Sequence, residues 1–196
     1  MRVVHADDRL VVVDKPAGLL SVPGRTEPDS ASARVQALYP DALIVHRLDQ
    51  PTSGLLLLAR GAQAQRELSA AFAERRVGKT YVAVVAGHLE GAGLIDLPLG
   101  ADWPNRPRQQ VDLEHGKASQ TRWRVLAHEG PATRVALQPV TGRSHQLRVH
   151  LAHIGHAILG DALYAAADIA VASPRLLLHA SELRIGAHHF VCPPEF

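Results

Sequence analysis

The carboxylate of Asp49 is the clearest candidate for chemistry in this sequence of 196 residues. It lies in residues 46–54, with the sequence HRLDQPTSG, between the apolar runs 43–45 and 55–58. This pattern predicts two strands joined by a turn, with the charges of Arg47 and Asp49 at the bend. A charged bend contributes little to a hydrophobic core, but it is well suited to presenting a carboxylate.

The sequence lacks the patterns that several other kinds of site require. It contains neither the Walker spacing of a phosphate loop nor the Gly-x-Gly-x-x-Gly segment of a dinucleotide site. Ser144 and His145 are adjacent, and no Gly-x-Ser-x-Gly elbow is present, which disfavours a serine hydrolase. A glycosidase uses two carboxylates, whereas residues 46–54 hold only Asp49. A mechanism with a single carboxylate, or no catalysis at all, remains.

The twelve histidines raise the question of a metal site. Four of them lie close together in the sequence: His145, His150, His153 and His156. No carboxylate or cysteine completes a ligand set at the usual spacing, and the neighbouring Arg143 and Arg148 would repel a cation. We therefore expect no metal.

The segment around Asp49 resembles the signature of the RluA family of pseudouridine synthases, HRLDxxTSG, in which the aspartate is catalytic. Three further segments resemble motifs of this family in the same order along the chain: residues 10–19, 79–81 and 142–150. The resemblance therefore covers nearly the whole chain. Two departures are Pro51, which would stiffen the turn, and Ala157, where relatives often have proline.

The resemblance implies an isomerisation in which the N-glycosidic bond of a uridine breaks, the uracil turns, and its C5 joins the ribose. Asp49 would act as nucleophile or base, and Arg143 is our candidate for keeping it ionised. Tyr81 would stack on the uracil and assist removal of the C5 proton, although its position equally suits a core tyrosine. Nothing is oxidised, hydrolysed or transferred to another molecule, so we expect no cofactor.

The same resemblance assigns candidate contacts with RNA. Arg47 corresponds to the residue that holds the RNA helix open after a base leaves the stack, whereas sequence position alone also suits a surface salt bridge. Leu147 would form an apolar wall beside the base, a position that an ordinary helix core residue would also occupy. Lys79, Arg106 and Arg108 are candidates for phosphate contacts, although charge runs are usually solvated faces.

Structured RNA is the implied partner. Residues 21–25 and 102–107 are most similar to the family member that acts on both 23S rRNA and the anticodon loop of certain tRNAs. The net charge of +2 permits a nucleic-acid partner without requiring one. Two alternatives remain open: an RNA-binding module of the same fold without catalysis, and a nucleoside hydrolase that uses one aspartate.

Apolar patterning predicts the elements that position these residues. We expect strands at residues 3–4, 10–13, 79–86, 94–99, 121–126, 133–140, 176–178 and 190–191, besides the two that flank Asp49. We expect helices over residues 31–38 and 62–77 and from 141 to 154, and a loop over 101–110. The prediction is an α+β fold, a single catalytic domain over residues 1–196 on a mixed, mainly antiparallel sheet with flanking helices and loops.

Composition and termini indicate a cytoplasmic monomer that does not enter a membrane. The chain has no signal-peptide segment, and no apolar run approaches the roughly 18 residues that span a bilayer. No long exposed apolar stripe that would pair two copies is evident. The lone Cys192 excludes an internal disulfide and is expected to be structural or at the surface, and His46 is expected to be structural. No S4-like domain is expected before the first strand.

Overall fold

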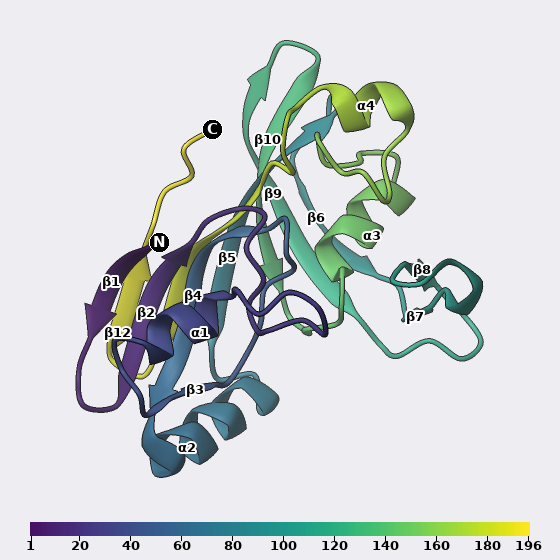
Figure 1. Cartoon of the computed structure of the whole chain (residues 1–196). Helices are drawn as coiled ribbons and strands as arrows, with labels where there is room; N and C mark the ends of the chain where they lie inside the picture. The colour runs from purple at the N-terminus through teal and green to yellow at the C-terminus, as the bar shows by residue number, and fades with distance from the viewer. The chain divides into compact units, whose positions relative to one another are not determined.

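The computed structural model describes residues 1–196 and divides into two compact units. Unit 1 consists of Met1–Lys79 and His179–Glu195, and unit 2 consists of Thr80–Leu178 with Phe196. Each unit contains its own series of paired strands with a few helices (Figure 1). Within each unit the strand pairs are antiparallel except for β4 and β11, which pair in parallel, so the predicted α+β class with a mixed, mainly antiparallel sheet is confirmed.

Unit 1 surrounds the segment that contains Asp49. Its elements are β1 (Arg2–Ala6), β2 (Leu10–Lys15), α1 (Ala31–Gln36), β3 (Ala42–Ile44), β4 (Ser53–Arg60), α2 (Gly61–Ala73), β11 (Leu178–Ile185) and β12 (His188–Val191). The strand order is β1-β2-β4-β11, with β3 paired to β4 and β12 to β11. The leucines and valines of β2 and β4 are fully or almost fully buried, which explains why both strands are continuous apolar runs.

Unit 2 contains the segments that carry Tyr81 and Arg143. Its elements are β5 (Gly78–Ala86), β6 (Ala92–Asp96), β7 (Leu99–Ala101), a 3-10 turn (Trp103–Asn105), β8 (Gln109–Val111), β9 (Gln120–Glu129), β10 (Ala132–Pro139), α3 (Gln146–His153) and α4 (Ala167–Val171). The strand order is β5-β10-β9-β6, and β7 and β8 form a separate two-stranded sheet. Leu151 of α3 packs with Val85 and Leu137 in the core of this unit.

The hairpin of β1 and β2, the helix capped by Ser30 and the pairing of β9 with β10 agree with the sequence predictions. The prediction for α2 was too long, because Arg75 adopts a left-handed φ of 60° and the helix ends at Ala73. The predicted strand 94–99 is two strands, since Pro98 lies between them and has no N–H to donate.

Three other boundaries also differ from the predictions. The ends of the predicted loop 101–110 pair as β7 and β8. The third helix begins at Gln146 and not at Thr141, because His145 before it has a left-handed φ of 54°. The strand expected at 176–178 is β11, which begins only at Leu178 and runs to Ile185, and α4 was not predicted. None of the helices combines the length and the apolar character needed to cross a lipid bilayer.

Candidate active site

The turn that carries Asp49 is held by buried hydrogen bonds on its N-terminal side. The backbone N–H of Leu48 donates to Ser21 Oγ at 3.0 Å, and that hydroxyl donates to the carbonyl of Leu48 at 2.7 Å. Within the turn, Thr52 N–H donates to the carbonyl of Asp49 at 3.1 Å. Ser21 and Thr52 are both almost fully buried. Because both backbone groups of Leu48 are satisfied by one hydroxyl, the residue before Asp49 has little freedom to move.

Lys15 holds the other side of the same turn. Its side chain is fully buried, and Nζ donates to the carbonyls of Gln50 at 3.0 Å and Leu19 at 2.7 Å. The N–H of Gly18 donates to the same Gln50 carbonyl at 2.9 Å. A buried ammonium is tolerated only when it is well hydrogen-bonded, so these carbonyls keep the end of β2 attached to the residue after Asp49.

Gly54 explains why the segment HRLDQPTSG ends in glycine. Its φ is +106°, and a Cβ atom on it would lie 2.3 Å from the carbonyl oxygen of Ala180. Ala180 belongs to β11, which runs parallel to β4 at this point. The residue beside it, Ser53, shares a 2.8 Å hydrogen bond with His179 Nδ1. The turn of Asp49 therefore leads directly into a close contact between strands that only glycine permits.

His46 is a packed structural residue, as its sequence position predicted. Its ring stacks on Phe72 with centroids 4.4 Å apart, and its Nε2 accepts the N–H of Leu57 at 3.0 Å. Burial, assisted by the nearby ammonium of Lys79, lowers the pKa of His46 to about 3. Burial also lowers the pKa of Lys79. The imidazole is therefore neutral at physiological pH, while the adjacent Arg47 is exposed to solvent.

Tyr81 and Leu147 are brought together by the core of unit 2. Tyr81 lies on β5 opposite Leu137 of β10 and packs against the cluster that includes Leu147 and Leu151. Leu147 is in the first turn of α3 and is 7% exposed. An aromatic ring and an aliphatic side chain that belong to one cluster are apolar groups of the kind that pack against the face of a base.

Arg143 lies at the surface, in the turn that precedes α3. Its N–H donates to Gln146 Oε1 at 3.0 Å, and its guanidinium faces the carbonyl of Ala118 at 3.4 Å. Gln146 is buried and also bonds the hydroxyls of Thr141 at 2.7 Å and Thr121 at 3.0 Å. The backbone of this turn is therefore fixed, whereas the charge of Arg143 is accessible. The expected pairing of Arg143 with Asp49 stays a prediction.

The second arginine of the same motif, Arg148, has a different environment. It is 3% exposed and donates two hydrogen bonds, of 2.8 and 2.7 Å, to the carboxylate of Asp161, which is 1% exposed. Its guanidinium also lies 5.0 Å from the centroid of the Tyr164 ring. Arg148 therefore stabilises the interior of unit 2.

Three of the histidines considered as metal ligands take part in internal hydrogen bonds. His150 bonds Thr121 Oγ1 at 2.9 Å and the carbonyl of Leu97 at 3.0 Å, so both ring nitrogens are occupied. His156 Nδ1 bonds the carbonyl of Ala86 at 2.9 Å, and His145 Nδ1 bonds the hydroxyl of Tyr164 at 2.5 Å. These contacts give the three histidines structural roles.

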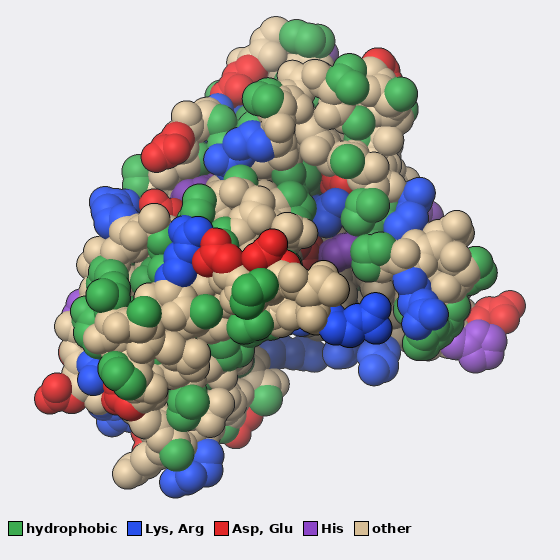
Figure 2. Space-filling view, viewed as in Figure 1, with side chains coloured by type: hydrophobic (Ala, Val, Ile, Leu, Met, Phe, Trp, Pro, Cys, Tyr) green, Lys and Arg blue, Asp and Glu red, His purple; other side chains and the backbone are tan.

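The hairpin of β7 and β8 presents cations on aromatic rings. The guanidinium of Arg106 lies 4.9 Å from the centroid of Trp103, which is 68% exposed, and that of Arg108 lies 5.5 Å from Tyr164. Tyr164 also accepts the N–H of Gln109 at 2.8 Å. Figure 2 shows Lys and Arg side chains next to hydrophobic ones over this hairpin. Exposed arginine and tryptophan together form a surface that suits phosphates and unstacked bases.

Sequence reasoning missed the supporting roles of Lys15 and Ser21. Both lie in segments that resemble the family, residues 10–19 and 21–25, but their types did not indicate a role. A lysine at the end of an apolar strand is normally exposed, and a serine in a loop is unremarkable in a sequence.

Comparison with known proteins supports the resemblance. Residues 9–153 match the family model described as RNA pseudouridylate synthase. The chain is 53% identical over 187 residues to "Dual-specificity RNA pseudouridine synthase RluA" of Escherichia coli O6:H1, covering 93% of this chain and 85% of that relative. It is 50% identical to the protein of the same name from Yersinia pestis, covering 100% of both chains. The solved structure "Human RNA Pseudouridylate Synthase Domain Containing 1" matches with a TM-score of 0.87 and 30% identity, covering 99% of this chain and 83% of that one.

Proposed function

Because the chain belongs to the RNA pseudouridylate synthase family, we propose that it converts specific uridines of structured RNA to pseudouridine with Asp49 as its catalytic carboxylate. The observation that supports Asp49 most directly is the way its turn is held. Ser21 fixes the residue before it and Lys15 the residue after it. Such supporting contacts are what a reacting group needs to keep its geometry.

In the proposed reaction, Asp49 acts as nucleophile or base toward the nucleoside and the bond between N1 of uracil and C1′ of ribose breaks. The uracil turns in place, and a bond forms between C5 and C1′. C5 then loses its proton and N1 ends with one, so the product has the composition of the substrate. Asp49 is regenerated, and no oxidant, reductant or cofactor takes part in the balance.

Three residues of unit 2 complete the proposed chemistry. Arg143 keeps Asp49 ionised, because an opposite charge nearby favours the carboxylate over the carboxylic acid. Its exposed guanidinium and fixed backbone support this role. Tyr81 stacks on the uracil and assists the transfer of the C5 proton, and Leu147 forms the apolar wall beside the base. The packing of both residues in one core cluster supports both assignments.

The remaining candidates are proposed to bind the RNA itself. Arg47, exposed and two residues before Asp49, holds the helix open in place of the flipped nucleotide. Arg106 and Arg108 contact phosphates from the hairpin of β7 and β8, where their cations are exposed. Lys79 is proposed as a further phosphate contact, although its half-buried position beside His46 favours it less than the two arginines.

We propose that the substrates are both 23S rRNA and the anticodon stem-loop of tRNA. The dual specificity in the name of the RluA relatives supports two classes of RNA. We further propose that residues 1–196 work as one catalytic domain, as a monomer in the cytoplasm. Mapping pseudouridines in RNA from cells with and without the protein would identify its targets. If modification disappears from only one class of RNA, the dual specificity is wrong.

The test of Asp49 is tritium release from RNA labelled at C5 of uracil. We expect Asp49→Asn to abolish release while RNA binding persists, because asparagine keeps the shape of the side chain without its charge. Asp41→Asn is the matched control, since Asp41 is exposed and pairs with Arg60 outside the turn. Full activity in Asp49→Asn would exclude Asp49 as the catalytic carboxylate.

Analysis of the products of the same reaction distinguishes the two alternative functions. If the wild-type protein binds RNA but produces no pseudouridine, it is an RNA-binding module of this fold. If free uracil appears among the products, it is a hydrolase. The identity of 53% over 93% of the chain with an RNA pseudouridine synthase supports catalysis over binding alone.

A further inference from the structure

Three side chains of unit 1 that have no part in the proposed reaction come together at its surface. His5 lies on β1, Asp7 in the turn that follows, and His188 at the start of β12. Each offers one nitrogen or oxygen atom, and these atoms all lie within 4.8 Å of one another. Two imidazoles and a carboxylate are a common ligand set for zinc in proteins.

The two carboxylate oxygens of Asp7 have separate partners. Oδ1 accepts the backbone N–H groups of Arg9 at 2.7 Å and Leu10 at 2.9 Å. Oδ2 faces His5 Nε2 at 2.8 Å. One oxygen therefore fixes the side chain to the turn, and the other is directed into the cluster. Metal ligands are commonly oriented in this way by a hydrogen bond on their other atom.

The two imidazoles are held by the backbone and by an aromatic wall. The pairing of β1 with β2 shifts between Val3 and His5, and such a bulge redirects the side chain beside it. The His5 ring lies 5.2 Å from Phe190 and 5.6 Å from His188. His188 stacks on Phe190 at 5.5 Å with 12° between the planes, and Phe190 is buried. The ion pair joins His5 to Asp7, and stacking on Phe190 brings His188 beside them.

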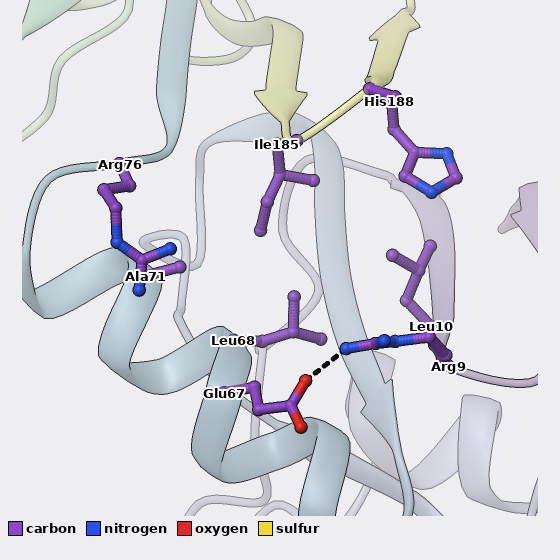
Figure 3. A pocket seen from close by; sticks show the side chains of 10 residues that line it. Arg9, Leu10, Glu67, Leu68, Ala71, Arg76, Ile185 and His188 are labelled. Carbon is purple, nitrogen blue, oxygen red and sulfur yellow. Dashed lines mark hydrogen bonds and ion pairs between the residues drawn. The ribbon is translucent and has the colours of Figure 1, made fainter.

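The cation nearest in sequence, Arg9, is neutralised by another partner. Its guanidinium forms an ion pair with Glu67 of α2, as the dashed line in Figure 3 shows. His188 also lines the cavity of ≈ 350 Å³ that Arg9 and Glu67 border, together with apolar side chains such as Leu68 (Figure 3). This opening would allow an ion and its remaining water to reach the ring.

A second group of possible ligands in unit 1 has a different character. Asp14, His179 and Cys192 also lie within 4.8 Å of one another. However, His179 Nδ1 bonds Ser53 and its Nε2 bonds the carbonyl of Cys192 at 2.9 Å. Both ring nitrogens already have protein partners, so this group is a structural hydrogen-bond cluster.

We propose that His5, Asp7 and His188 form a binding site for Zn²⁺, with water as the fourth ligand. Zinc bonds nitrogen and carboxylate oxygen at about 2.0–2.2 Å, so the three ligand atoms must close to a little over about 3 Å from one another. Small movements of the exposed His188 side chain accomplish this. Mg²⁺ and Ca²⁺ prefer sites made entirely of oxygen, which this one is not. The ion joins the first hairpin to β12 and leaves the Asp49 turn untouched.

The test is titration of the metal-free full-length protein with ZnCl₂ in competition with a chromophoric chelator, together with thermal unfolding with and without Zn²⁺. We expect one ion per chain and a rise in the unfolding temperature of the wild type. His188→Ala should weaken binding at least about tenfold and remove that rise. Asp7→Asn is the second variant and should also weaken Zn²⁺ binding. It should still fold, because its amide oxygen can accept the N–H groups of Arg9 and Leu10.

His189→Ala is the matched control, since His189 is on the same strand but pairs with Glu182 at 3.1 Å. It should bind Zn²⁺ as the wild type does, and all variants should keep wild-type pseudouridine formation. Failure of the wild type to compete with the chelator would refute the site. Equal binding by the wild type, His188→Ala and Asp7→Asn would also refute it, because the ion would then lie elsewhere on the chain.

Discussion

Replacement of Arg148 with alanine should destabilise the protein far more than the same change at Arg143. Arg148→Ala leaves the carboxylate of Asp161 at 1% exposure without its cation. Removing one partner of a buried ion pair costs about 3–5 kcal/mol of unfolding free energy. Asp161 keeps the N–H groups of Leu163 at 3.0 Å and Tyr164 at 3.2 Å, so we expect about 3 kcal/mol, at the lower end of that range.

The assay is urea unfolding of each variant, supported by thermal unfolding. For a chain of this size, about 3 kcal/mol corresponds to a fall of roughly 6–12 °C in the unfolding temperature. Arg143→Ala is the matched control from the same motif, and we expect a change within about 0.5 kcal/mol because this side chain is exposed. The double variant Arg148→Met with Asp161→Asn should recover part of the loss, since it leaves no unpaired charge.

The reasoning would be refuted if Arg148→Ala cost less than about 1 kcal/mol, which is the range of an exposed pair. It would also be refuted if the double variant lost as much stability as Arg148→Met and Asp161→Asn lose when each is measured alone and the losses are added, because the two residues would then be independent. Activity measurements complete the comparison. Arg143→Ala should lose pseudouridine formation while its free energy of unfolding stays normal. In Arg148→Ala the main effect should be the loss of stability, and any loss of activity should follow from it.

Three other predictions concern the turn of Asp49 and its surroundings. Lys15→Met should lower kcat for tritium release at least about tenfold, because the turn loses the hydrogen bond that holds the Gln50 carbonyl. Circular dichroism should show intact secondary structure. An unchanged kcat would contradict a role for Lys15 in holding the turn. Gly54→Ala should lower the free energy of unfolding, measured in urea, by about 3 kcal/mol or more, since its Cβ would meet Ala180. Gly61 has a φ of +75° and open space around it, so Gly61→Ala should cost only about 1–2 kcal/mol. Equal effects of the two substitutions would contradict the close contact at Gly54. The pKa of His46 is about 3 in the folded protein and near its ordinary value when unfolded, so stability should fall as pH drops below about 6.5, by up to about 1.4 kcal/mol per pH unit. When the free energy of unfolding is measured from about pH 4 to 8, His46→Gln should show a smaller change with pH than the wild type. An identical pH dependence would assign the effect to other groups.

Several features of this protein were predictable because they depend on residues close together in the chain. The apolar runs on either side of Asp49 predicted its two strands, and the segment HRLDQPTSG indicated both the turn and the family. Ser30 before an alanine-rich segment indicated a helix, and its hydroxyl does cap α1. Local hydrogen bonding and alternation of burial decide such elements, and both can be read from neighbouring residues.

Tertiary structure decided the roles of residues whose partners are distant in the chain. Arg143 and Arg148 look alike in the sequence, and burial beside Asp161 makes one structural while the other remains accessible. Lys15 holds Gln50 only because β2 and β4 pair in one register. His5 meets His188 only because β12 returns to the first hairpin. The sequence by itself determined the family, most of the strands and the candidacy of Asp49. Pairing between distant segments decided which charged side chains are buried in structural hydrogen bonds and which are exposed to solvent, because burial is a property of the folded chain.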